Sequence, residues 1–469
     1  MTTRFLWGAL ASITLAAAPL AAQQFSQDIP LSGLGNGNPA KPFGIAYEPG
    51  LDRIFVAIAG GFGAENNVVA VIDPNTDTVV GTIPVGLYPE EIAFGYDTNG
   101  VLLYGAVTNS TSGTVTVFEP DLSVRGEVNL PDPFGLGTCY PFGIAWDAGI
   151  KRFYVSTLDG SGDIHSVNPA TVTTSPIAPF NAAFSSGSRL LVHAGRVWNG
   201  ATRYNASFTN ADSFVANFKI SNKAREEVLI ADETRHFFPS VQDIIALPNN
   251  DVLVGGLGLN SYLYQFDANG ELRNTLYLNN ASGAHGLALG PQGRLLAICD
   301  LYSDSVILYD LAERTELSLT AMGSIGQGYG QPNDAVFVHN KLYVTSQATE
   351  EVVVFDNLPT PPPAGGGYSG VISVSNPTPT LGDTVTVDVT GNGVVALAQA
   401  REAIGVNFRG FDMDIGPLIT LVGVSPNSFS EAATIPNNAA LRGLHLWFQG
   451  AVELDGTPRL TEPRVLIVQ

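Results

Sequence analysis

The chain has 469 residues and combines ordinary hydrophobic content with abundant Gly and Pro and only 14% charged residues. Such a composition is typical of a turn-rich all-β protein, and the length suffices for one large domain and a smaller one. Acidic residues outnumber basic ones 43 to 22, for a formal net charge of -21, which argues against nucleic acid and anionic membranes as partners and agrees with cations or basic ligands.

Residues 1–22 have the features of a secretory signal peptide. Arg4 supplies a positive charge, residues 5–20 are apolar, and Ala21 and Ala22 are small residues suited to a cleavage site. No later stretch reaches the ~18 apolar residues that a membrane-spanning helix needs. We therefore expect a mature protein that is secreted or periplasmic, without a transmembrane segment, and able to associate with the cell surface.

Residues 68–94, VVAVIDPNTDTVVGTIPVGLYPEEIAF, hold the clearest pattern in the chain: two short alternating strands around a turn, then a third strand opened by Pro89. Related segments recur, each with a turn and two further apolar runs. The seven copies start with PFGIA at Pro42, PEEIA at Pro89, PFGIA at Pro141, FNAAF at Phe180, VQDII at Val241, AHGLA at Ala284 and PNDAV at Pro332. Four strands per repeat of roughly 40–60 residues predict a β-propeller of seven four-stranded blades.

Two copies depart from this pattern. The fourth carries an extra segment, residues 196–213, which we interpret as a long loop before its third strand. The seventh ends after its third strand, at Asn357, so residues 24–32 are expected to supply the missing fourth strand and to close the ring. The propeller is therefore predicted to span residues 23–357.

The rest of the chain reads as a linker and a second all-β module. Residues 358–370 are a run of prolines followed by glycines. Residues 371–469 contain clean alternation in TVTVDV from Thr384 and in LHLWFQGAVEL from Leu444, which favours a small β-sandwich.

Two stretches resemble known families. The V-x-V-I-D, T-x-T-V and I-P-V-G-x-x-P pieces of residues 68–94 resemble the YVTN-type, NHL-like propeller repeat. The last hundred residues, with Ile435-Pro436-Asn437-Asn438 and Leu446-x-Phe448-Gln449, resemble a C-terminal β module found on exported bacterial proteins. The second resemblance implies export and display on the cell surface, and no activity.

The first strand of each blade is expected to line the central channel, so two residues at its start face one mouth. These start pairs are Phe43-Gly44, Glu90-Glu91, Phe142-Gly143, Asn181-Ala182, Gln242-Asp243, His285-Gly286 and Asn333-Asp334. One interpretation is a Ca²⁺ ion or another divalent cation held by some of Glu91, Asp243, Asn333 and Asp334, because hard cations prefer carboxylate and amide oxygens. The alternative is that these residues are polar because the channel holds water.

A weaker resemblance supports the cation. Asn333-Asp334 and Ala284-His285-Gly286 are similar in kind to strand starts of the gluconolactonase and streptogramin-lyase propellers, which hold a metal in this channel; the rest of those motifs does not match. The resemblance implies His285 as a general base for lactone hydrolysis or elimination. Alternatively, His285 forms a hydrogen bond to the backbone of a neighbouring blade.

A second candidate site combines basic and aromatic residues near the same mouth. Its members are Arg196, Trp198, Arg203 and Tyr204 of the long fourth-blade loop, and Arg235 and His236 of the next connection between blades. Such residues suit ligand recognition, since Arg reads anionic groups and aromatic rings supply rigid contact area. The alternative is an insertion that packs its aromatic residues into a small core of its own.

No catalytic or phosphate-binding motif stands out, and Cys139 and Cys299 fall on separate blades, which disfavours a disulfide between them. The sequence therefore favours a binding or interaction protein that uses the channel mouth, with an extracellular protein, a glycan or a small molecule as partner. The first alternative is a metal-dependent hydrolase or lyase of the lactonase kind. The second is a purely structural exported protein.

Overall fold

The computed structural model describes two parts of the chain. The first part is residues 24–358, apart from residues 134, 136, 179–184, 205–210, 223, 232–239, 258–261, 279–282, 313–314 and 322–329. The second part is residues 371–375, 380, 383–400, 406–408, 411–413, 420–434, 445–454, 457–460 and 464–467. The predicted signal peptide and the linker lie outside the described residues, apart from Leu358.

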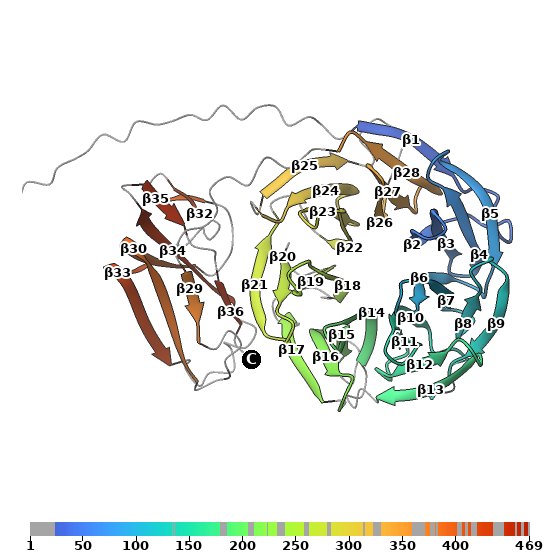
Figure 1. Cartoon of the computed structure of the whole chain (residues 1–469), viewed down its shortest axis with the longest axis horizontal. Helices are drawn as coiled ribbons and strands as arrows, with labels where there is room; N and C mark the ends of the chain where they lie inside the picture. Colours follow the sequence, from blue (N-terminus) through green and yellow to red (C-terminus); the bar gives the residue numbers. More distant parts are fainter. Residues whose placement is uncertain are drawn as a thin grey trace, which may run out of the picture.

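Seven four-stranded antiparallel sheets form a closed ring, which confirms the predicted seven-bladed propeller (Figure 1). Blade 1 contains β2 (Pro42–Glu48), β3 (Arg53–Gly61), β4 (Ala64–Asp73) and β5 (Thr78–Pro84). Blade 2 contains β6 (Pro89–Tyr96), β7 (Leu102–Asn109), β8 (Thr114–Phe118) and β9 (Val124–Asn129). Blade 3 contains β10 (Pro141–Asp147), β11 (Arg152–Thr157), β12 (Ile164–Asn168) and β13 (Thr173–Ala178).

The remaining blades follow the same order from the innermost to the outermost strand. Blade 4 contains β14 (Ser185–His193), β15 (Arg196–Tyr204), β16 (Ala211–Lys219) and β17 (Arg225–Ala231). Blade 5 contains β18 (Ser240–Ala246), β19 (Val252–Leu257), β20 (Tyr262–Phe266) and β21 (Leu272–Tyr277). Blade 6 contains β22 (Ala284–Leu289), β23 (Leu295–Asp300), β24 (Ser305–Asp310) and β25 (Thr315–Ala321). Blade 7 contains β26 (Pro332–Val338), β27 (Lys341–Ser346), β28 (Glu351–Asp356) and β1 (Gln24–Pro30).

The ring is closed by its first strand, as predicted. β1 pairs antiparallel with β28, with Asp28 opposite Val353 and Ile29 opposite Val352. Ile29 is buried in a cluster that joins apolar residues of blades 1 and 7, among them Ile54 and Tyr343. The outermost strand of blade 7 thus comes from the opposite end of the propeller sequence, which ties the last blade to the first.

The predicted strand assignment in blade 4 is wrong by one strand. The innermost strand β14 contains residues 189–193 of the RLLVHAG run, which the pattern predicts as a second strand. The predicted long loop contains β15 and the start of β16. Ala194 and Gly195, both at positive φ, form the tight turn between β14 and β15. RLLV looks like a second strand because RIFV, RFYV and RLLA occupy that place in other blades.

The C-terminal module is all-β, as expected. Its main sheet has six antiparallel strands: β29 (Val371–Val374), β30 (Thr384–Ala400), β33 (Thr420–Thr434), β34 (His445–Leu454), β35 (Thr457–Leu460) and β36 (Arg464–Ile467). β31 (Val406–Phe408) and β32 (Phe411–Met413) form a separate two-stranded sheet.

Three further observations concern the whole described chain. Within the described residues, no helix is long and apolar enough to cross a membrane.

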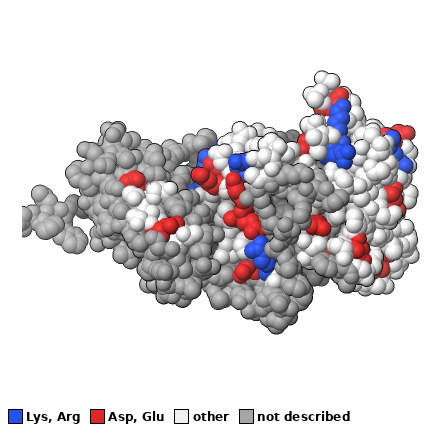
Figure 2. Space-filling view, turned by 90° about the horizontal axis from the view of Figure 1, so that it is seen from below, with Lys and Arg blue, Asp and Glu red and all other residues white. Residues whose placement is uncertain are grey.

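Cys139 and Cys299 are both buried and free of disulfide bonds. On the face seen in Figure 2, acidic and basic side chains lie close together in several places.

Candidate functional site

A register shift occurs at the start of the innermost strand in every blade. In blade 1, for example, Pro42 lies opposite Ile58 but Ile45 lies opposite Val56, so Phe43 and Gly44 form a bulge. Bulges re-aim side chains, and here they fall on the predicted start pairs. In blade 4 the bulge lies between Gly187 and Leu190, so the true start pair is Ser188-Arg189 and not Asn181-Ala182.

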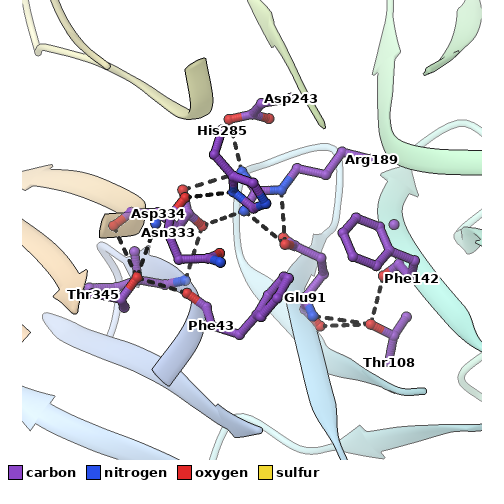
Figure 3. Close-up of polar contacts among 12 residues, drawn as sticks. Phe43, Glu91, Thr108, Phe142, Arg189, Asp243, His285, Asn333, Asp334 and Thr345 are labelled. Carbon is purple, nitrogen blue, oxygen red and sulfur yellow. Dashed lines mark hydrogen bonds and ion pairs between the residues drawn. The ribbon is translucent and has the colours of Figure 1, made fainter. Parts of the chain in front are cut away.

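Arg189 is the centre of the site. Its guanidinium contacts three carboxylates from three other blades: Glu91 at 2.8 Å, Asp243 at 2.8 Å and Asp334 at 3.0 Å (Figure 3). Its side chain is only 8% exposed, and those of its partners are 5 to 13% exposed. We call these four residues the axial hub. The hub joins blades 2, 4, 5 and 7 across the ring.

Backbone donors also bind the carboxylates of the hub. Asp243 Oδ2 accepts a hydrogen bond of 2.6 Å from the N–H of Leu287 in blade 6. Asp334 Oδ2 accepts one of 3.1 Å from the N–H of Ile45 in blade 1. Each aspartate therefore binds the next blade as well as Arg189, and charge-assisted bonds of this kind are the stronger ones.

Hydroxyl groups of the second strands connect neighbouring start pairs. Thr108 Oγ1 accepts from the N–H of Glu91 at 3.1 Å and donates to the carbonyl of Phe142 at 2.7 Å. Thr345 repeats this arrangement between Asp334 and Phe43, at 3.0 and 2.9 Å. These hydrogen bonds fix the backbone of the bulges, and with it the direction of the hub side chains.

The hub and its neighbours have displaced pKa values. Burial raises the pKa of Glu91 to about 8 and that of Asp243 to about 6, despite the opposing charge of Arg189. Burial alone lowers the pKa of Arg189, but its three carboxylate partners raise it well above the ordinary value. Burial also raises the pKa of Glu90 well above its usual range. Arg189 therefore stays charged, and Glu91 keeps its proton to a higher pH than an exposed glutamate does.

His285 takes the second of its two predicted roles. Its Nδ1 lies 3.0 Å from the backbone oxygen of Asn333 in blade 7, a hydrogen bond to the neighbouring blade. Burial, followed by the charge of Arg189, lowers the pKa of His285 to about 4. The imidazole is neutral at pH 7 and is then a weak base.

The residues predicted to bind a divalent cation do come together, but around a different cation. Glu91, Asp243 and Asp334 all contact the guanidinium of Arg189, which occupies the place where their oxygens converge. Among the described residues, no group of three or more His, Cys, Asp or Glu is arranged to hold a metal ion. The hub as built therefore does not fit a resident Ca²⁺ ion.

The second predicted site is not assembled at a mouth loop. Arg196 and Trp198 lie in β15 and are buried. Arg196 pairs with Glu226 at 2.8 Å, and Arg203 pairs with Glu227 at 3.0 Å and lies over the ring of Phe214. Tyr204 ends β15 and is half-buried. Arg235 and His236 lie outside the described residues.

Sequence reasoning missed Arg189, although one signal pointed to it. Gly44, Gly143 and Gly286 each precede, by one blade, a charged hub residue. A Cβ on any of these glycines would come within 2.3 to 2.5 Å of the next blade's backbone oxygen. Glycine therefore allows the bulge of the next blade to pack against it. The glycine of Phe142-Gly143 predicts that the start pair of blade 4 has such a bulge, with a side chain directed to the axis. The turn at Ala194-Gly195 marks the end of the innermost strand of that blade and so places Arg189 near its start.

Comparisons with known proteins show the fold and no closer relationship. No family model and no curated protein matches the chain. Among solved structures, it is similar to a hydrazine synthase structure of Kuenenia stuttgartiensis, with 16% identity and a TM-score of 0.53 over 70% of this chain and 98% of that one.

Two further structures have comparable TM-scores. The Cps50 (Swd1) β-propeller domain of Myceliophteria thermophila has 10% identity and a TM-score of 0.53 over 72% of this chain and 100% of that one. Raptor of Chaetomium thermophilum has 13% identity and a TM-score of 0.52 over 72% of this chain and 30% of that one. At such low identity these likenesses establish the propeller fold, a scaffold for binding in general.

Proposed function

We propose that this protein is an exported interaction protein that binds a protein partner through one face of its propeller. In an antiparallel four-stranded blade, the start of the first strand, the loop between the second and third strands and the connection to the next blade lie on the same side. We call this side the loop face. The start pairs of the innermost strands therefore lie on the loop face.

The observation that carries the proposal is the position of the exposed aromatic residues. Phe62, 79% exposed, is in the β3–β4 loop, and Tyr302, 62% exposed, is in the β23–β24 loop. Leu158 and Leu87 are also exposed on this face, in the β11–β12 loop and the β5–β6 connection. Large rigid apolar side chains of this kind anchor protein–protein interfaces.

Backbone strain on the same face supports the proposal. Lys41, Tyr88, Tyr140 and Gln331 each precede the proline that starts an innermost strand, and each has a φ between 37° and 60°. Left-handed backbone is costly for bulky residues and concentrates at functional sites. At Tyr88 it holds the ring in a stack with Phe62, with ring centroids 4.9 Å apart.

Replacing Phe62 and Tyr302 together by Ser is expected to weaken partner binding at least about tenfold, because each change removes an interface anchor. Peptides selected on the immobilised mature protein from a displayed library serve as the probe, and their affinities are measured by calorimetry. The control is Val101→Ser with Ile150→Ser, since these exposed residues lie in the β6–β7 and β10–β11 turns on the opposite face. Selected peptides that bind the loop-face variant undiminished contradict the proposal.

Export is the second part of the proposal, and it rests on residues 1–22 and on the similarity of the last hundred residues to a display module. When the whole chain is expressed in a bacterium, we expect the protein outside the cytoplasm to begin at Gln23. Intact-mass measurement of the exported protein checks this. Retention of the full-length chain in the cytoplasm contradicts it.

The metal-dependent hydrolase or lyase is not favoured by any observation on the hub. Its carboxylates are occupied by Arg189, and the neutral His285 binds a backbone oxygen. We derive no catalytic step from this arrangement.

A further inference from the structure

We propose that the propeller axis, at the start pairs beside the hub, binds a protonated amine against the rings of Phe43 and Phe142, with Asn333 Oδ1 as the acceptor of its N–H group. This inference goes beyond the proposed function and uses other residues than the loop-face anchors.

Aromatic rings from three blades surround this part of the axis. The ring centroids of Phe43 and Phe142 are 5.8 Å apart, and those of Phe43 and His285 are 6.0 Å apart, with nearly perpendicular planes in both cases. Figure 3 shows Phe43 and Phe142 pointing inward beside Glu91 and Arg189. Aromatic faces attract cations within about 6 Å of the ring centroid, and clustered rings are a known means of ammonium recognition.

An unpartnered acceptor lies among these rings. Asn333 is 2% exposed, and its Oδ1 is buried without a hydrogen-bond partner. Its side chain points toward the axis, between Phe43 and His285 (Figure 3). A buried acceptor left unmatched destabilises the folded protein, so this position favours a ligand that donates a hydrogen bond. Glu90 Oε2, in the start pair of blade 2 next to that of Phe43, is also buried without a partner.

The charges favour a cation over an anion. The hub sets three carboxyl groups against one guanidinium, and Arg189 already contacts all three of them. The nearby imidazole of His285 is neutral at pH 7, so it adds no positive charge. The formal net charge of -21 also raises the local concentration of small cations around the protein.

Calorimetric titration of the mature protein with n-butylammonium tests the proposal, with butyrate and 1-butanol as matched probes. We expect saturable binding of about one n-butylammonium per chain and none of butyrate. Asn333→Leu and Phe43→Leu are each expected to weaken amine binding about tenfold, by removing the acceptor or the ring. Asn333→Asp is expected to strengthen it, because it adds a negative charge, so the two changes at position 333 have opposite effects.

Val101→Ser, on the opposite face, is the control and should bind n-butylammonium like the unaltered protein. The amine could belong to a lysine side chain of a polypeptide or to a free small molecule. Nα-acetyl-lysine amide, compared with its norleucine analogue, distinguishes these two sources. Preference for the lysine compound assigns the site to a side chain of a polypeptide, and preference for n-butylammonium assigns it to a free amine. The proposal is overturned if butyrate binds as well as the amine, or if Asn333→Asp and Phe43→Leu both leave amine binding unchanged; these two variants decide the matter should Asn333→Leu fail to fold.

Discussion

Replacing Arg189 by Met is expected to lower the free energy of unfolding of the propeller by about 3–5 kcal/mol, the usual effect of removing one partner from a buried ionic cluster. Met keeps most of the side-chain volume, so the loss reports on charge. Glu91, Asp243 and Asp334 would remain buried beside one another without a counterion. The variant should recover part of its stability as the pH is lowered, because protonation relieves the repulsion among these carboxylates.

Urea unfolding of the mature protein followed by fluorescence measures this loss. Arg53→Met is the matched control, because Arg53 forms a longer, more exposed ion pair of 3.5 Å with Asp73. Surface pairs contribute at most about 1 kcal/mol, so the control should unfold close to the unaltered protein. Equal losses in the two variants would show that the hub is not a central stabilising element. Ca²⁺ should leave the unfolding midpoint of the unaltered protein unchanged, since Arg189 occupies its place.

Replacing Glu91 by Gln is expected to reduce the loss of stability that accompanies a rise in pH from 6.5 to 8. The folded-state pKa of Glu91 is about 8 and its ordinary value is 4.5, so between these values the folded protein binds more protons than the unfolded one. Stability therefore falls as the pH rises through this range, by on the order of 2 kcal/mol from pH 6.5 to 8 for this one group. Gln cannot ionise but still offers an oxygen to Arg189.

The window above pH 6.5 isolates this effect. Asp243, raised to about 6, has lost most of its proton there. His285, lowered to about 4 from an ordinary value of 6.5, affects stability mainly below about pH 7 and in the opposite direction. Glu90 also has a raised pKa, so Glu90→Gln combined with Glu91→Gln should flatten the remaining slope. Urea midpoints at four pH values check this, and an unchanged slope in the double variant would rule out these two groups as its source.

The candidate site was only half visible in the sequence. Glu91, Asp243 and Asp334 could be placed near the axis because each lies at the start of an innermost strand, and such positions follow from the repeat. The assembled hub confirms that they come together, but their partner was not foreseen. Arg189 had been assigned to a second strand, because RLLV matches the second strands of other blades and apolar runs in neighbouring strands look alike.

The similarity of apolar runs in neighbouring strands also explains why the predicted ligand-binding residues of blade 4 lie in a strand and not in a loop. Trp198 and Arg203 had been placed in a loop because residues 196–213 appeared to be an insertion, whereas β15 and β16 are ordinary members of blade 4. An alternation of apolar residues identifies a strand but not its place within a blade. That place is set by pairing with neighbours, and pairing is a property of the folded chain.

What the sequence by itself determined is the architecture: seven four-stranded blades, closed by residues near the N-terminus, followed by an all-β module. Repetition determines this, because each copy of an alternating pattern must bury its apolar face against the next. What only the tertiary structure decided is which cation balances the axial carboxylates. The four hub residues are about 50 to 240 residues apart in sequence and meet only when the ring closes, so the choice between a metal ion and the guanidinium of Arg189 depended on the position of one strand.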